Sequence, residues 1–347
     1  MAKQITYMLM IVFPLLTLVA CNGADLVQDD VPVMEDLFAE LPSGERMHYL
    51  AAGNPNGKPV LFLHGFPSSA HLYRNILHQV CADSDSDYYC LAISLIGFGQ
   101  SSCPGDGSQV SPLYEVARVE EFISLMDLND AAVVVHDWGG PIGTAATLRN
   151  ADRFSHLIIL NTMLSFPENR FLENVMGVTR NFFEQPRPLI ERIYPEFVAS
   201  VMQTMTTRRL SQRVLDLYRA PFRQQEEVTP GVAACRVHAG INLFAKAEID
   251  KPLFTEIEQL AADFWADKPT VFFWSSDDLL LGSRSWIGIA AHAGMEALFP
   301  QAGTILFPQA DHFLQEDQPQ AIARELLHFI GVASANDIRV GPPVPGG

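Results

Sequence analysis

Apolar residues in the middle of the chain fall into short, unbroken runs instead of alternating with polar ones. Such runs are typical of strands that are buried on both faces of a parallel sheet. Stretches with helical spacing, such as residues 72–80 and 113–126, separate the runs. The pattern predicts a doubly wound α/β fold. The predicted strands are residues 60–63, 88–93, 131–135, 157–160, 270–274 and 304–307.

Two regions depart from this series of apolar runs, one before its first strand and one in its middle. Residues 36–40 and 46–51 form two strand-like runs around Pro42-Ser43-Gly44, which predicts a hairpin. After Asn161 the strand pattern stops, and helical spacing replaces it until Thr270. This predicts a helical cap inserted into the core. The expected organisation is a core of residues 34–162 and 251–332, a cap of residues 163–250, a closing helix at 319–330 and a flexible tail of residues 333–347.

The N-terminus has the features of an export signal. Lys3 precedes an apolar run at residues 5–20 that is short for a membrane-spanning helix. The run ends in Leu18-Val19-Ala20-Cys21, which resembles a bacterial lipobox, in which cleavage before the cysteine leaves its thiol to carry lipid. We therefore expect a signal peptide over residues 1–21, a lipid on Cys21 and a polar tether over residues 22–33. The protein would then be held on the periplasmic side of a bacterial membrane. An uncleaved anchor, or a secretory signal with an incidental cysteine, is the alternative.

Composition narrows the choice of partners. The 347 residues are 48% hydrophobic, which is sufficient for one large domain with an inserted subdomain. The formal net charge of −17 argues against binding to nucleic acid or to an anionic membrane surface, because a negative field repels phosphate. An uncharged small molecule fits better. The sequence gives no indication of the oligomeric state.

The cysteines after Cys21 show no metal-ligand spacing. An exported protein can form disulfides, and Cys81 and Cys90 flank a loop rich in Asp and Ser, so they either pair or remain free thiols. The sequence does not decide the pairing of the full set, which is Cys81, Cys90, Cys103 and Cys235.

Asp137 occupies the strongest chemical motif in the chain. The apolar run Val133-Val134-Val135 leads through His136 to Asp137-Trp138-Gly139-Gly140-Pro141, a strand, a sharp turn and a helix. This is the pattern of a nucleophile elbow, whose turn exposes one side chain at the carboxyl edge of the sheet. Nowhere does the chain contain Gly-x-Ser-x-Gly. A carboxylate is already ionised at neutral pH and can attack saturated carbon to form an ester. The alternative is an Asp that only caps the following helix.

His312 is the candidate base. It lies in a loop directly after the last predicted strand, and it alone among the ten histidines has that placement. The order nucleophile, acid, histidine is the one that this type of fold requires. Its role would be to deprotonate the water that attacks the Asp137 ester. A surface-loop histidine without a function is the alternative, and His64 is expected to be structural.

A carboxylate should orient the imidazole, and two adjacent residues, Asp277 and Asp278, follow the strand at residues 270–274. Main-chain N–H groups should hold the oxyanion. One belongs to Trp138, the residue after the nucleophile. The other is expected from Phe66 in His64-Gly65-Phe66-Pro67, where Gly65 allows close approach of the backbone.

Four stretches together resemble the haloalkane dehalogenases. They are His64-Gly65-Phe66-Pro67, His136-Asp137-Trp138-Gly139-Gly140, Tyr218-Arg219-Ala220-Pro221-Phe222 and His312-Phe313-Leu314-Gln315-Glu316-Asp317, and the likeness covers residues 34–332. The resemblance implies an α/β-hydrolase fold, with a mostly parallel central sheet, helices on both faces and an inserted helical cap. It implies hydrolysis of a carbon–halogen bond to alcohol, halide and a proton, with no cofactor and no metal. It favours Asp278 over Asp277, because the family places the acid four residues after the aromatic residue, and it makes the Trp138 indole a halide donor.

The sequence departs from that family at the second halide donor. Relatives use either an Asn after the His-Gly pair or a Trp in the cap. Here the first position is Phe66, and no Trp lies between Trp138 and Trp265. Either the halide site is incomplete, or a residue elsewhere, such as Asn161 or a cap side chain, supplies the second donor.

Two other functions remain open. An epoxide hydrolase uses the same Asp, His and Asp but needs cap tyrosines to protonate the ring oxygen, and Tyr194 and Tyr218 lie in the predicted cap. A non-catalytic, lipid-anchored binding protein on the same scaffold is the alternative of another class. For the enzymes, the expected partners are water and a small apolar organic substrate.

Overall fold

The computed structural model describes residues 32, 34–81, 86–165, 187–223, 230–246, 250–264 and 268–331. The predicted signal peptide, Cys21, the predicted tail and almost all of the predicted tether lie outside these residues, as does Trp265. No helix in the described ranges is both long enough and apolar enough to cross a membrane.

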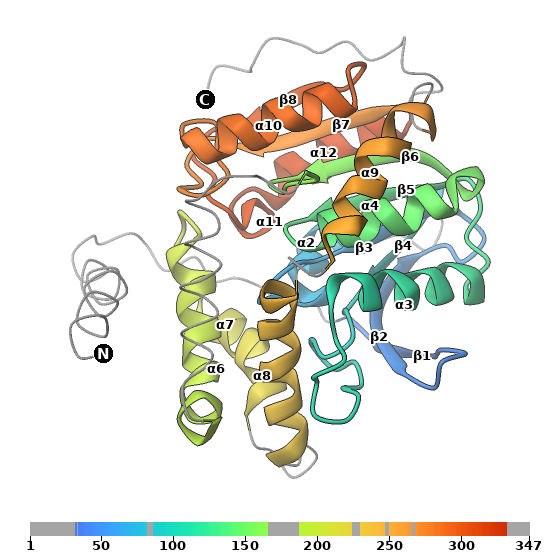
Figure 1. Ribbon diagram of the computed structural model, residues 1–347. Coiled ribbons are helices and arrows are strands. Elements are labelled where there is room, and N and C mark those ends of the chain that lie inside the picture. The colour runs from blue at the N-terminus through green and yellow to red at the C-terminus, as the bar shows by residue number, and fades with distance from the viewer. Residues whose placement is uncertain are drawn as a thin grey trace.

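An eight-stranded sheet forms the centre of the molecule, in the order β1-β2-β4-β3-β5-β6-β7-β8 (Figure 1). β2 pairs antiparallel with β1, as the predicted hairpin requires, and antiparallel with β4. All the other pairs are parallel. The strands are β1 (Asp36–Glu40), β2 (Arg46–Gly53), β3 (Lys58–Leu63), β4 (Tyr88–Ile93), β5 (Ala131–His136), β6 (Phe154–Leu160), β7 (Thr270–Ser275) and β8 (Gly303–Phe307).

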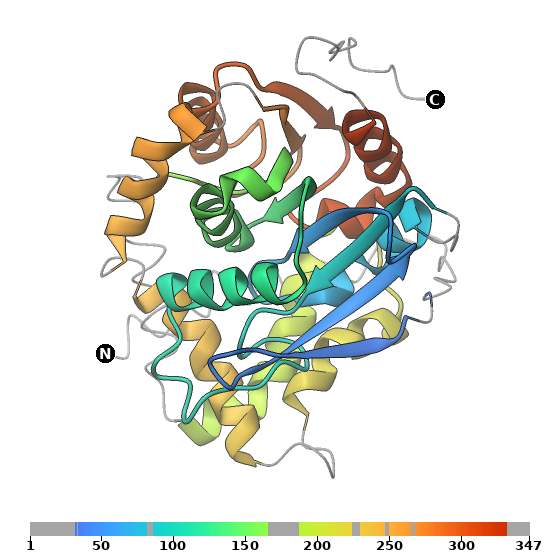
Figure 2. The same ribbon diagram turned by 90° about the vertical axis from the view of Figure 1, so that its right-hand side faces the viewer.

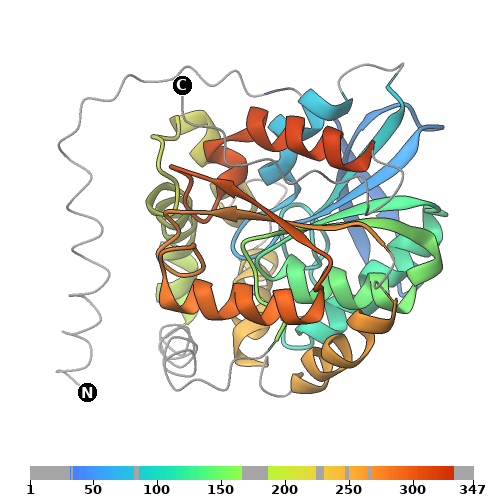
Figure 3. The same ribbon diagram turned by 90° about the horizontal axis from the view of Figure 1, so that it is seen from above.

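The unbroken apolar runs are the buried strands. Every residue of β5 is buried, and the last four residues of both β3 and β4 are buried. Helices cover both faces of the twisted sheet (Figures 2 and 3). One face carries α2 (Arg74–Cys81) and α12 (Pro319–Ile330). The other carries α3 (Pro112–Leu125), α4 (Gly139–Arg149), α9 (Lys251–Phe264) and α10 (Trp286–Leu298).

Helices of the cap lie beyond the carboxyl ends of the parallel strands (Figure 1). They are α6 (Arg187–Thr204), α7 (Gln212–Arg219), the short 3₁₀ turn η4 (Ala220–Phe222) and α8 (Pro230–Ala245). The carboxyl edge of the sheet therefore faces the cap, which is where the nucleophile elbow was predicted.

The four cysteines of the described chain form two disulfides. Cys81 at the end of α2 is bonded to Cys90 in β4, one of the two outcomes that the sequence left open. Cys103, in the loop after β4, is bonded to Cys235 in α8. The second bond joins the core to the cap.

Candidate active site

Asp137 stands at the turn between β5 and α4. Its φ angle is +50°, a conformation that non-glycine residues rarely adopt and that is typical of a nucleophile elbow. The two glycines after it are required by space, since a Cβ on Gly139 would lie 2.5 Å from the main-chain oxygen of Leu63, and one on Gly140 would lie 2.0 Å from Oγ1 of Thr162. The turn is thus held by close packing of backbone against backbone and side chain.

His312 lies between two carboxylates. Its Nδ1 is 2.8 Å from Oδ2 of Asp278, and its Nε2 is 3.6 Å from Oδ2 of Asp137. His312 and Asp278 are buried, whereas the Asp137 side chain is 19% exposed. Asp137 is therefore the member of the three that a substrate can reach.

Asp277, the alternative acid, points elsewhere. Its Oδ1 accepts hydrogen bonds from Arg284 Nη1 at 2.7 Å and from Ser276 Oγ at 2.8 Å. The structure thus brings Asp278, and not Asp277, to the imidazole.

Asn161 fixes Asp278 in place. The Asn161 Nδ2 donates to Asp278 Oδ2 at 3.0 Å, and the Asn161 Oδ1 accepts from the main-chain N–H of Ser275 at 2.9 Å. The other oxygen of Asp278 accepts from the N–H groups of Leu280 and Leu281 at 2.8 and 2.9 Å. Asn161 was one of the residues considered as a second halide donor, but its amide is directed at the acid.

Electrostatics favour a charged resting site. Burial disfavours the imidazolium, but Asp278 and Asp137 outweigh burial and raise the pKa of His312 to about 10. Burial also works against the charged form of Asp137, yet the neighbouring imidazolium of His312 lowers the pKa of that carboxyl overall. The pKa of Asp278 is lowered in the same way against its own burial. The site thus holds an ionised Asp137 beside an imidazolium.

Main-chain N–H groups hold the carboxylate of Asp137. The N–H of Phe66 donates to Asp137 Oδ1 at 2.6 Å, and the N–H of Trp138 contributes to the lowered pKa of Asp137. A Cβ on Gly65 would lie 2.1 Å from Asp137 Oδ1, so the close approach requires glycine there. His64 is fully buried, accepts the N–H of Leu95 at 3.0 Å and is kept neutral by burial, which lowers its pKa to about 4. It supports the loop and does not face the reaction.

Aromatic rings line the accessible side of Asp137. The ring of Phe244, from α8, packs edge-to-face against Phe66 with centroids 4.9 Å apart, and against Trp138 with centroids 5.2 Å apart. All three are half-buried, and Phe197 from α6 lies beyond Phe66. These surroundings are suited to a small apolar molecule.

The two cap tyrosines have different environments. The hydroxyl of Tyr218 donates a hydrogen bond to the carboxylate of Glu316 and lies 3.4 Å from Nη1 of Arg74. The hydroxyl of Tyr194 lies beside Gly240, where an added Cβ would be 2.7 Å from that oxygen and 2.9 Å from Cε2 of Phe66. The structure therefore places Tyr194 next to Phe66, whereas the Tyr218 hydroxyl is hydrogen-bonded to a buried ion pair.

Sequence reasoning missed three residues around the site. Arg74 and Glu316 form an ion pair with two hydrogen bonds, and each side chain is only 1% exposed. The pair joins α2 to α11 (Leu314–Asp317), which directly follows the His312 loop. His136 is buried and contacts the backbone of His312. His136 and His312 both stand in the motifs quoted above, but the local sequence does not show which distant group each of them contacts. Among the described residues, no three His, Cys, Asp or Glu side chains are grouped as metal ligands would be.

Comparisons with known proteins agree with this fold. Residues 58–319 match the alpha/beta hydrolase fold family. The haloalkane dehalogenase of Psychrobacter cryohalolentis is 28% identical over 291 residues, which cover 82% of this chain and 87% of that protein. The epoxide hydrolase of Caballeronia sordidicola is 25% identical over 306 residues, which cover 80% and 89%. The crystal structure of haloalkane dehalogenase DbeA from Bradyrhizobium elkani shares the fold, with a TM-score of 0.68 at 22% identity over 86% of this chain and 98% of that one. The chain is a hydrolase that belongs to the alpha/beta hydrolase fold family.

Proposed function

We propose that the protein hydrolyses the carbon–halogen bond of small haloalkanes through a covalent ester on Asp137. The observation that carries the proposal is the line Asp278–His312–Asp137, with a reachable carboxylate at its end and aromatic rings around it. Similarity to haloalkane dehalogenases over most of the chain supports the same substrate class.

The first step forms the ester. Asp137 Oδ1 is held by the N–H of Phe66, so Oδ2 is the oxygen that attacks carbon. A carbon–oxygen bond forms as the carbon–halogen bond breaks, and the halide leaves with the bonding electron pair. The indole N–H of Trp138 donates to that halide.

The second step hydrolyses the ester. Alkylation removes the charge of Asp137, which is one of the causes of the raised pKa of His312, so the imidazolium becomes a stronger acid. It releases its proton to solvent, which is the proton that accompanies the halide in the overall reaction, and neutral His312 remains. Neutral His312 takes a proton from water, and the hydroxide adds to the carboxyl carbon of Asp137. The negative charge that develops on Oδ1 is stabilised by the N–H groups of Phe66 and Trp138. Collapse releases the alcohol and restores the carboxylate.

Tyr194 favours epoxide hydrolysis as a second candidate function. Its hydroxyl lies next to Phe66 and Gly240, on the side of the cap that faces the site. There it can donate a proton to the oxygen of an opening ring while Asp137 attacks the ring carbon. The Tyr218 hydroxyl is already hydrogen-bonded to Glu316, so this chain would use one tyrosine where two were expected.

A panel assay separates the two functions. Purified protein is incubated with brominated alkanes and with terminal epoxides, and bromide and diol are measured in parallel. Bromide release establishes the dehalogenase, whereas diol formation without bromide release establishes the epoxide hydrolase. Asp137→Asn should abolish either activity and leave the circular dichroism spectrum unchanged. An active Asp137→Asn protein would refute the assigned nucleophile, and a wild type that only binds the substrates would favour the binding-protein alternative.

We also propose that Cys21 carries lipid and holds the enzyme at the cell envelope, on the basis of the Leu18-Val19-Ala20-Cys21 sequence. In a bacterial host, the full-length chain should fractionate with membranes and Cys21→Ser should not. An intact mass without a lipid at the mature N-terminus would refute this.

A further inference from the structure

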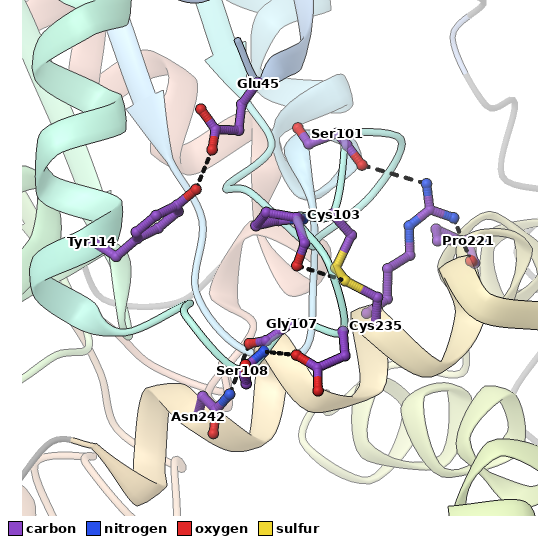
Figure 4. The surroundings of a disulfide bond; sticks show 12 residues. Glu45, Ser101, Cys103, Gly107, Ser108, Tyr114, Pro221, Cys235 and Asn242 are labelled. Atoms are coloured by element: carbon purple, nitrogen blue, oxygen red, sulfur yellow. Dashed lines mark hydrogen bonds between the residues drawn. A yellow bond between two sulfur atoms is a disulfide. The ribbon is translucent and has the colours of Figure 1, made fainter. Parts of the chain in front are cut away.

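One face of α8 is fixed to the loop that follows β4. Cys235 is bonded to Cys103, and the Asn242 Nδ2 donates to the main-chain oxygen of Gly107 at 2.8 Å (Figure 4). The Lys246 ammonium donates to the main-chain oxygen of Ser108. Successive helix residues are turned by about 100°, so positions 235, 242 and 246 share one face.

The loop approaches this face too closely for side chains to intervene. Gly97 and Gly107 both have positive φ angles, +83° and +80°. A Cβ on Gly97 would lie 2.4 Å from the Cβ of Ala239, and one on Gly107 would lie 2.4 Å from the main-chain oxygen of Cys235. The loop thus contacts α8 directly both before and after Cys103 in the sequence. The disulfide therefore crosslinks an interface that is already formed.

The opposite face of α8 faces the site. Gly240 and Phe244 are four residues apart, so they lie together, roughly half a turn from the fixed face. Phe244 contacts Phe66 and Trp138, and Gly240 leaves the space that the Tyr194 hydroxyl and the Phe66 ring occupy. A rotation or shift of α8 would move this wall of the site directly.

We propose that Cys103 and Cys235 are positioning residues for substrate binding. Their disulfide crosslinks core and cap across 132 residues and fixes α8, so that Phe244 and Gly240 form a rigid wall that sets the size of the substrate pocket. The inference rests on the proposed function. It assigns the two cysteines no part in bond breaking, so their loss should change recognition of the substrate more than the chemical step.

The two disulfides of the chain provide a matched experiment. Cys103→Ser/Cys235→Ser frees α8, whereas Cys81→Ser/Cys90→Ser removes a bond that lies within the core, between α2 and β4. With 1-bromobutane, the first variant should raise KM about tenfold with kcat within about threefold of wild type, because a wall displaced by about 1 Å weakens positioning. It should also increase activity toward bromocyclohexane relative to 1-bromobutane. The core variant should keep the wild-type KM and selectivity even if its melting temperature falls.

Hydrogen exchange tests the clamp without any turnover. The amides of residues 230–246 should exchange faster in Cys103→Ser/Cys235→Ser than in the wild type, and those of α2 should not. A wild type that turns over neither class of substrate overturns the proposed function. Unchanged exchange in α8, or a change in KM equal to that of the core variant, overturns the role of Cys103 and Cys235. If the first variant does not fold, the same exchange and KM measurements apply to wild-type protein reduced with dithiothreitol, with intact mass showing which disulfide has opened.

Discussion

The Nε2 atom of His136 lies 2.9 Å from the main-chain oxygen of His312, so the residue before Asp137 holds the backbone of His312. A carbonyl oxygen only accepts hydrogen bonds, so Nε2 carries the proton. Burial, with a further effect from His312, lowers the pKa of His136 to about 3. The ring therefore stays neutral and does not repel the imidazolium of His312, whose centroid is 4.8 Å away.

His136→Phe should slow hydrolysis of the ester and spare its formation. The substitution removes the donor to His312 but touches neither Asp137 nor its N–H contacts. We expect hydrolysis to fall about 10- to 100-fold, so that halide appears as a stoichiometric burst and the ester accumulates on Asp137. Rapid quench and intact mass measure both. Equal slowing of both steps, without accumulated adduct, would count against a positioning role, and His136→Gln, which keeps a donor, should restore part of the lost rate.

Asn161→Ala should affect the same step. The Asn161 amide holds Asp278, which orients His312, so its loss should slow ester hydrolysis by about tenfold and leave the first halide burst at its wild-type rate. Single-turnover halide release is the deciding measurement. A slower burst would instead mean that Asn161 contacts the leaving halide.

Tyr218→Phe and Tyr194→Phe should differ in kind. The Tyr218 hydroxyl contacts a buried carboxylate, so its loss should lower the free energy of unfolding by about 2 kcal/mol and leave turnover within about twofold of wild type. Urea unfolding and steady-state kinetics test both statements. If epoxides are substrates, Tyr194→Phe should reduce diol formation by about 100-fold without that loss of stability. Loss of diol formation in Tyr218→Phe would show that its bond to Glu316 opens during the reaction.

Local pattern was sufficient to predict the sheet. Each predicted parallel strand lies within an observed one. Most of these strands are apolar along their length because they are buried on both faces, whereas the edge strand β8 is buried only at Phe307. The elbow was equally readable, since the start of the helix after the turn needs glycine at positions 139 and 140. The helix predicted at residues 72–80 is in fact a 3₁₀ turn, η2 (Ala70–Tyr73), followed by α2, a difference that hydrophobic spacing does not encode.

Contacts between distant segments were not predictable from the sequence. The resemblance favoured Asp278 over Asp277, but the contact of Asn161 with Asp278, formed as the loop after β7 folds, was not predicted. The partner of Tyr218 depends on an ion pair between residues 242 positions apart, Arg74 and Glu316. In each case the local sequence is compatible with several partners, and only the packing of distant segments selects one.

The dependence of stability on pH should report the charged state of His312. Its pKa is about 10 in the folded protein, against an ordinary value of 6.5 that we take for the unfolded chain. A raised pKa means that the folded state binds the proton more tightly, so this stabilisation is complete below pH 6.5 and is lost as the pH rises through 10. Between these values the free energy of unfolding should fall by up to about 1.4 kcal/mol per pH unit.

His312→Gln should remove that slope, because glutamine does not titrate. Unfolding in urea at several pH values between 6 and 10 gives the slope for each protein, and the difference between wild type and variant cancels the other titrating groups. His78→Gln, on the exposed face of α2, is the control and should keep the wild-type slope. Parallel curves for wild type and His312→Gln would mean that His312 is neutral in the resting enzyme. Ester formation would then not be needed to make His312 neutral. The proposal that the lost charge of Asp137 lowers the pKa of His312 before the second step would be wrong.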